Sequence, residues 1–198
     1  MDGTTYHHGD LRTALLEAAH AELDASGLEG LSMRKVARRA GVSHAAPAHH
    51  FADANGLLTA LAAYGYERFI GAMQARCEAA APEPEAQLDA AGLGYVDFAL
   101  QETALFRLIH ASERPDHSDA ELCEVAARAY SFITHIVMSV TGKAEDDPAT
   151  MRDVAAVWAM AHGLADLISA GRLVSVSSLP PAQREGAVVE LMRRSLPL

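Results

Sequence analysis

The residues of this chain whose chemistry is clearest are four basic side chains set close together. Arg34, Lys35, Arg38 and Arg39 lie within residues 32–51, which contain no acidic residue, so this segment carries a local charge of +4. Clustered Lys and Arg side chains neutralise the phosphates of nucleic acids. The whole chain has a formal charge of −10, which leaves −14 outside the segment. We predict nucleic-acid binding by this one surface with modest non-specific affinity, although Arg38 and Arg39 could instead face solvent or pair with acids of the preceding helix.

Residues 32–51 also carry the signals that would position these side chains as two short helices joined by a turn. Ser32 can cap the first helix with its hydroxyl. Gly41 can adopt the positive φ found at helix ends, and Ser43 can cap a second helix that reaches about His50. This is the helix-turn-helix pattern, in which the second helix presents its N-terminal side chains to the major groove of DNA.

The second helix offers few polar groups for reading base edges. The candidates for polar contact are Ser43, His44, His49 and His50. The candidates for apolar contact with thymine methyl groups are Ala45, Pro47 and Ala48. Arg34, near the start of the preceding helix, could reach a phosphate or a base edge. The alternative is that these residues are surface positions on a motif that no longer binds DNA.

Across residues 6–62 the sequence resembles the TetR family of one-component transcriptional regulators. The resemblance rests on residues 6–12 (YHHGDLR), 37–43 (ARRAGVS), 45–47 (AAP), 50–53 (HFAD) and 57–58 (LL). It implies a homodimer that binds a palindromic double-stranded DNA operator and a small-molecule effector. It also implies that the arm formed by Tyr6, His7 and His8 contacts the DNA backbone, unless this arm is a frayed terminus. Trp158, His162 and Gly163 resemble the signature of the subgroup named for Trp-His-Gly.

Two positions depart from the residues that the family usually has. This chain has Ala48 in place of a usual Tyr and Ala54 in place of a usual Lys. Both usual residues contact DNA phosphates, so their loss should weaken anchoring, which His44, His49 and His50 would offset in part and more strongly at low pH. Two other functions therefore stay open: a helical small-molecule-binding protein with weakened or lost DNA binding, and a protein-interaction module that docks through its head.

The spacing of apolar residues and the Gly and Pro breaks predict helices along the whole chain. We expect them over about 10–26, 53–80, 118–142, 148–171 and from 180 onward, with two more in 85–112 and a Ser-rich loop at 172–179. Ser118 with Glu121 forms a capping box, and Asp147 followed by Pro148 is a strong start signal. The expected fold is all-α with about nine helices: a three-helix helix-turn-helix DNA-binding head, residues 1–52, and a helical ligand-binding and dimerisation body, residues 53–198.

Two sites are expected in the body. By analogy with the family, a ligand cavity would lie between the fourth helix and the three after it, lined by residues that could equally be plain core: Met73, Phe98, Phe106, His110, Tyr130, Phe132 and Trp158. The helix over 148–171 is apolar around most of its circumference, which indicates burial on more than one side. One side would meet a second protomer, and the expected interface residues are Val157, Ala161, Leu164, Ile168, Val188, Val189 and Met192.

The expected function is transcriptional repression that a ligand relieves. Two recognition helices entering successive major grooves of an operator need a spacing of about 34–36 Å. A small, largely apolar effector would favour a body conformation in which the fourth helices move the heads away from that spacing.

Other classes of function are disfavoured. No Gly-rich phosphate loop or nucleophile motif indicates an enzyme, and no cofactor is expected. The chain has ten histidines, but His7-His8 and His49-His50 are adjacent pairs that point about 100° apart on a helix, so no metal is expected. The lack of an apolar run of membrane-spanning length predicts a soluble, cytoplasmic protein without membrane contact, in which Cys77 and Cys123 are free thiols.

Overall fold

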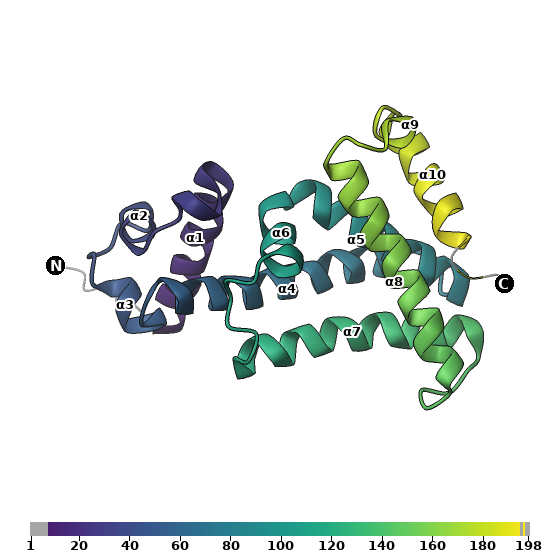
Figure 1. Ribbon diagram of the computed structural model, residues 1–198, viewed down its shortest axis with the longest axis horizontal. Helices are drawn as coiled ribbons and strands as arrows, with labels where there is room; N and C mark the ends of the chain where they lie inside the picture. The colour runs from purple at the N-terminus through teal and green to yellow at the C-terminus, as the bar shows by residue number, and fades with distance from the viewer. Residues whose placement is uncertain (1–7, 195, 197–198) are drawn as a thin grey trace. The chain divides into compact units, whose positions relative to one another are not determined.

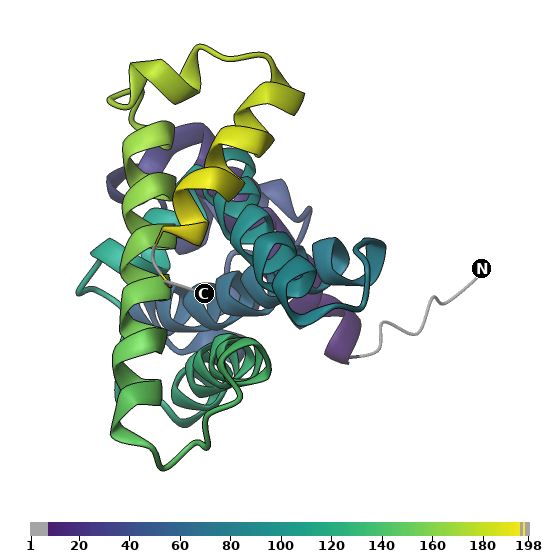
Figure 2. The same ribbon diagram turned by 90° about the vertical axis from the view of Figure 1, so that its right-hand side faces the viewer.

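The computed structural model describes residues 8–194 and 196, and the regular structure within them is entirely helical. Figures 1 and 2 show the helices from two directions. They are α1 (His8–Gly30), α2 (Met33–Arg39), α3 (Ala46–Phe51), α4 (Ala54–Ala79), α5 (Pro84–Gln101), α6 (Thr103–Ala111), α7 (Ala120–Thr141), α8 (Pro148–Ser169), α9 (Val174–Ser177) and α10 (Pro181–Arg193). The all-α expectation is confirmed. The extra helix, α9, lies in the segment predicted as a Ser-rich loop, where Val176 is buried.

The chain divides into two compact units, which are described separately. The first comprises Met1–Gly65 and Ala104–Val125, and we call it the head unit. The second comprises Tyr66–Thr103 and Ala126–Leu198, and we call it the body unit. Helices α4 and α7 each contribute residues to both units.

In the head unit, α1 and α2 share a small apolar core. Leu15, Ala19 and Leu23 recur along α1 at helical spacing and are buried, as is Val36 of α2. Gly27 has a φ of 67°, which a glycine adopts easily. The first helix was predicted to end there, but Gly27 forms a kink and α1 continues to Gly30.

The helix-turn-helix follows the predicted signals at α2 and departs from them at α3. The hydroxyl of Ser32 accepts from the backbone N of Lys35 at 3.4 Å, and Gly41 has a φ of 70°. The predicted cap at Ser43 is wrong, because α3 begins at Ala46 and has no side-chain cap. Pro47 lies in its first turn, where its fixed φ suits a helix start.

The junction between α3 and α4 is tight. Ala52 has a φ of 61°, which is uncommon for a residue with a side chain. The carboxylate of Asp53 accepts from the backbone N of Asn55 and of Gly56, at 2.9 Å each, and so caps α4 as predicted. A Cβ on Gly56 would lie only 2.0 Å from the carbonyl oxygen of Phe51, so this position requires glycine.

In the body unit, α5, α8 and α10 pack together (Figures 1 and 2). An aromatic cluster fills the centre: the ring of Phe69 lies 4.7 Å from that of Tyr95 and 5.4 Å from that of Phe98. A Cβ on Gly94 would lie 2.6 Å from the Ala72 carbonyl oxygen, so glycine allows α5 to approach α4 closely.

The start signals of the later helices have mixed outcomes. Asp147 caps α8 as predicted, since its carboxylate accepts from the backbone N of Ala149 at 2.7 Å. The capping box at Ser118 and Glu121 is wrong. Asp119 accepts from the N of Leu122, while Ser118 donates its hydroxyl to Asp116. Within the described ranges, no helix is both long and apolar enough to span a bilayer.

Candidate nucleic-acid interface and effector cavity

The head unit exposes the start of α3 and the turn before it. Ser43, His44, Ala45, Ala48 and His49 are exposed, and His50 is half-buried. Pro47 is buried, so its ring anchors α3 in the head and leaves little surface for a thymine methyl group. Neither α2 nor α3 contains an acidic residue. The exposed residues of α3 and the turn before it therefore carry no negative charge, and their polar side chains are hydroxyl and imidazole.

The four cations of the basic cluster divide into two pairs. Arg39 donates to the carboxylate of Glu22 on α1 at 2.8 and 3.1 Å, and Lys35 lies 3.5 Å from the same carboxylate. Arg34 and Arg38 are exposed. Solvent exposure and pairing with the preceding helix were the two alternatives for Arg38 and Arg39. Arg39 pairs with an acid of α1, whereas Arg38 faces solvent.

Glu22 is the buried centre of this arrangement. It is only 5% exposed, and the hydrogen bonds from Arg39 hold the pKa of its carboxyl below the usual value, against the opposing effect of burial. Ser26 also donates its hydroxyl to this carboxylate at 3.1 Å. Half of the local positive charge therefore anchors α2 on α1, and half stays available to DNA.

The two positions that depart from the family pattern, Ala48 and Ala54, are both exposed. Neither methyl group can bond a phosphate, so the phosphate contacts that the usual Tyr and Lys would supply are missing from this surface. Of the predicted arm, Tyr6 and His7 lie outside the described residues, and so does the side chain of His8.

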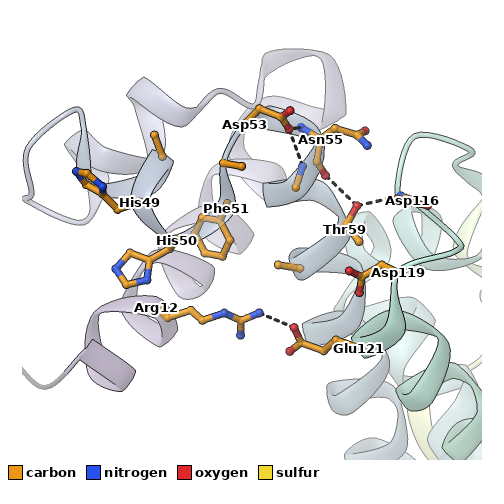
Figure 3. A pocket seen from close by; sticks show the side chains of 14 residues that line it. Arg12, His49, His50, Phe51, Asp53, Asn55, Thr59, Asp116, Asp119 and Glu121 are labelled. Atoms are coloured by element: carbon orange, nitrogen blue, oxygen red, sulfur yellow. Dashed lines mark hydrogen bonds and ion pairs between the residues drawn. The ribbon is translucent and has the colours of Figure 1, made fainter.

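A wide polar groove lies beside α3 within the head unit (Figure 3). It offers about 590 Å³ to water. Arg12 and Glu121 form an ion pair at 2.7 Å on its wall, and the backbone N of Asp116 donates to the hydroxyl of buried Thr59 at 2.9 Å. The first bond joins α1 to the first turn of α7, and the second joins α4 to the segment between α6 and α7.

The body unit contains a second, very different cavity. Its lining is almost entirely apolar, with a volume of about 310 Å³, and only about 20 Å³ of it could hold water. The lining residues are Met73, Leu88, Ala91, Gly92, Tyr95, Ile133, Ile136, Val157, Trp158, Ala161 and Met192. Met73 and Met192 are flexible side chains that can move to admit a ligand.

Two lining residues of this cavity, Tyr95 and Trp158, carry polar side-chain groups, and hydrogen bonds connect these groups with His162. The indole N–H of Trp158 donates to the hydroxyl of Tyr95 at 3.2 Å, and that hydroxyl lies 2.9 Å from Nδ1 of His162. Burial raises the pKa of Tyr95 far above its ordinary value, so the hydroxyl stays protonated at physiological pH. With the Trp158 N–H as donor, the Tyr95 hydroxyl can donate to His162.

The residues predicted to line a ligand cavity are distributed over both units. Met73 and Trp158 line the body cavity. Phe98 packs on Phe69 in the adjacent core, and the ring of Tyr130 lies 6.0 Å from that of Trp158. Phe132 is half-buried on α7. Phe106 and His110 belong to the head unit, where their rings are 4.9 Å apart.

The prediction missed Tyr95, although a signal for it exists. Leu88, Ala91, Gly92 and Tyr95 follow one another at i, i+3, i+4 and i+7 on α5 and all line the cavity. Gly92 in this stripe marks a close approach, since a Cβ there would lie 3.1 Å from Cε of Met192.

Six of the residues predicted at a dimer interface are buried inside the protomer, and the seventh, Val189, is half-buried. The six are Val157, Ala161, Leu164, Ile168, Val188 and Met192. A different stripe of α8, one residue away in register, is exposed or half-buried in the protomer: Ala156, Met160, Gly163 and Leu167. Its spacing of i, i+4, i+7 and i+11 makes one continuous apolar face.

A helix-turn-helix head with an exposed second helix, carried on one chain with a helical body that encloses an apolar cavity, defines the class of one-component DNA-binding regulators. Residues 15–61 match the family model described as bacterial regulatory proteins, tetR family, and residues 88–194 match the model described as tetracyclin repressor-like, C-terminal domain. The chain belongs to the TetR family of transcriptional regulators, whose members bind DNA and are not enzymes.

Individual relatives agree with this assignment. The HTH-type transcriptional regulator BetI of Paraburkholderia phymatum is 30% identical over 137 residues, which is 60% of this chain and 70% of that protein. A solved structure of a protein of unknown function from Rhodococcus sp. RHA1 is 32% identical with a TM-score of 0.79, covering 99% of this chain and all of that one. A TetR-like transcriptional regulator from the same organism is 17% identical with a TM-score of 0.63, covering 95% and 96% of the chains, and shares the fold.

Proposed function

We propose that this regulator is a repressor whose homodimer binds a palindromic operator and releases it when a small, largely apolar ligand enters the body cavity. The proposed DNA binding rests on the exposure of the start of α3 and of Arg34. In addition, neither α2 nor α3 contains an acidic residue. The observation that carries the ligand half is the apolar lining of the body cavity.

Selection of bound sequences from random double-stranded DNA, followed by a salt titration on the selected site, tests the DNA half. We expect a palindrome whose affinity falls steeply with salt and is lost in the Arg34→Ala, His49→Ala double variant. The double variant Arg172→Ala, His135→Ala makes the same two changes at exposed positions of the body unit and should bind normally. Recovery of no motif would favour the alternative of a small-molecule-binding protein with lost DNA binding, for which exposed Ala48 and Ala54 are the supporting observation.

Trp158 provides the test of the ligand half, because it is the only tryptophan of the chain and lines the cavity. Cyclohexanol should change its fluorescence more strongly than methylcyclohexane does, since only cyclohexanol can bond the Tyr95 hydroxyl. Ala91→Leu, which fills part of the cavity, should abolish the response, whereas Ala155→Leu on the exposed side of α8 should not. An unchanged response in Ala91→Leu would place the ligand elsewhere.

We also propose that the body belongs to the Trp-His-Gly subgroup. Support comes from the shared hydrogen bonds of Trp158 and His162 with Tyr95, which give the signature residues a common partner. Gly163 is the third signature residue. A Cβ on Gly163 would have no neighbour within 4 Å in the protomer, which leaves room for contact with another chain.

The dimer interface we propose is the exposed or half-buried apolar stripe of α8, joined by half-buried Val189 of α10. Leu167→Glu should shift the protein to monomer in sedimentation equilibrium, because it places a charge in an apolar contact. Met151→Glu makes the same change at an exposed position on the opposite side of α8 and should leave the dimer intact. Equal behaviour of the two variants would reject this interface.

Release would follow from a shift in populations. The functional division we propose is a DNA-reading segment, residues 1–52, and an effector-binding and dimerisation segment, residues 53–198, with action in the cytoplasm. Since α4 has residues in both compact units, a ligand that biases the body can bias the head spacing through this helix. A ligand that binds the body and leaves operator affinity unchanged would contradict the mechanism.

A further inference from the structure

A second groove of the body unit combines apolar lining residues with charged side chains, one of them an arginine. It lies between α5 and α10, with about 220 Å³ open to water and about 600 Å³ in total. That total lies within the range of about 300–1,000 Å³ typical of small-molecule sites. Its apolar lining residues are Leu93, Val96, Leu100 and Val188, and Arg184 also lines it. This groove shares no residue with the cavity that contains Trp158.

Arg184 is the unusual member of this lining. Among the described residues, its Nε is buried and has no hydrogen-bond partner. Buried polar atoms of this kind normally have a partner, and a charged donor without one is costly. The guanidinium of Arg184 therefore lacks the full set of acceptors that a charged donor normally has, and Arg binds carboxylates with two parallel hydrogen bonds.

The two acidic side chains of the groove do not oppose an anion as strongly as their charge suggests. Arg76 pairs with both, at 2.6 Å to Asp97 and 2.8 Å to Glu185. These contacts raise the pKa of Arg76, with the hydrogen bond to Glu185 as the largest cause, so this guanidinium stays charged and offsets one of the two negative charges.

The start of α10 adds to the same preference. Pro181 lines the groove, and the first turn of α10 has no side-chain cap and no acidic residue. The N-terminus of a helix carries a partial positive charge that favours anions.

We propose that this groove binds a carboxylate with a short aliphatic chain, as a ligand site separate from the body cavity. The carboxylate would accept from Arg184 near the start of α10, and the chain would lie on Val96, Leu100 and Val188. Burial of the chain supplies the apolar part of the affinity, and the charge supplies selectivity against uncharged analogues.

Calorimetric titration of the full chain with sodium octanoate, and separately with octan-1-ol, tests this proposal. Octanoate should bind the more tightly, and its affinity should fall with ionic strength. Arg184→Gln should weaken octanoate binding by about tenfold or more, which corresponds to about 1.4 kcal/mol per factor of ten. Arg194→Gln is the matched control, because Arg194 follows the same helix, is exposed and pairs with Glu190 outside the groove.

A second variant keeps the test decisive if Arg184→Gln is poorly folded. Gln101 is an exposed residue of the groove lining, and Gln101→Glu adds a negative charge there at little structural risk. It should weaken octanoate binding and leave octan-1-ol binding unchanged. Absence of octanoate binding at millimolar concentration, equal binding of octan-1-ol, or unchanged affinity in both variants would overturn the proposal. Repeating both titrations in the Ala91→Leu variant, which fills part of the other cavity and leaves the groove lining unchanged, separates these outcomes from the proposed repressor function.

Discussion

The groove of the head unit is the larger of the two spaces and is polar, whereas the cavity of the body unit is smaller and apolar. The head groove offers about 590 Å³ to water, against about 20 Å³ in the body cavity. Yet the head groove holds polar groups that already bond each other, such as Arg12 with Glu121. The lining of the body cavity is almost entirely apolar, and its polar side-chain groups are on Tyr95 and Trp158. Apolar area removed from water drives ligand binding, so the smaller space is the better candidate for an effector.

Each unit also depends on one glycine at a close backbone approach, and these two positions allow the units to be perturbed separately. Gly56→Ala should give the largest effect, because its Cβ would lie 2.0 Å from the Phe51 carbonyl oxygen, which is backbone and cannot rotate away. We expect a loss of about 3 kcal/mol of stability in the head and loss of operator binding. Trp158 emission, which reports on the body, should stay normal. A changed emission spectrum would show that the two units are not separable.

Gly94→Ala makes the corresponding change in the body unit. Its Cβ would lie 2.6 Å from both the Ala72 oxygen and the Met73 Cα, so α4 and α5 must separate beside the effector cavity. We expect a loss of about 1–3 kcal/mol in urea unfolding followed by Trp158 fluorescence. Gly71→Ala, in open space on the exposed side of α4, is the control and should raise stability by about 0.5–1 kcal/mol. Equal effects of the two variants would argue against close packing at Gly94.

Restoring phosphate contacts tests how far the head surface has been weakened. Ala48→Tyr with Ala54→Lys adds a hydroxyl donor and a cation at two exposed positions. Operator affinity should rise, and the slope of log affinity against log salt should steepen by about 0.9 for each additional phosphate that the protein neutralises. The measurement is fluorescence anisotropy at several salt concentrations. An unchanged slope would mean that neither position faces the DNA backbone.

The smallest expected effect concerns the buried carboxylate of the head. The hydrogen bonds from Arg39 lower the pKa of Glu22 in the folded state, so its stabilising contribution is fully present above the unfolded value of about 4.5 and is lost as pH falls through the lower folded value. The difference in thermal midpoint between wild type and Glu22→Gln should therefore be constant near neutral pH and shrink below about pH 4.5. A difference that does not change with pH would contradict the charged pair.

Much of the fold was predictable because its signals are local. Ser32, Gly41, Asp53 and Asp147 act through backbone groups one to three residues away, so sequence spacing is enough to recognise them. The start of α3 was misplaced because Ser43 and Pro47 give competing local signals, and only the packing of buried Pro47 decides between them.

The sites were less predictable because their partners are distant in the chain. The apolar circumference of α8 indicates burial on several sides, but it does not show which side contacts which neighbour. Six of the seven residues predicted at the dimer interface are buried within the protomer. Tyr95 and His162 are 67 residues apart, and no periodicity connects them. Phe106 and His110 have the same aromatic character as true cavity residues but belong to the other compact unit.

The position of Met192 near the end of α10 has a consequence for protein synthesis. Met192 forms part of the wall of the effector cavity and packs against Gly92 of α5. Because the chain is made from its N-terminus, α5 and α8 emerge from the ribosome before this wall exists. A nascent chain would fold its first helices before this wall is complete, and the proposed effector response would need α10 to dock.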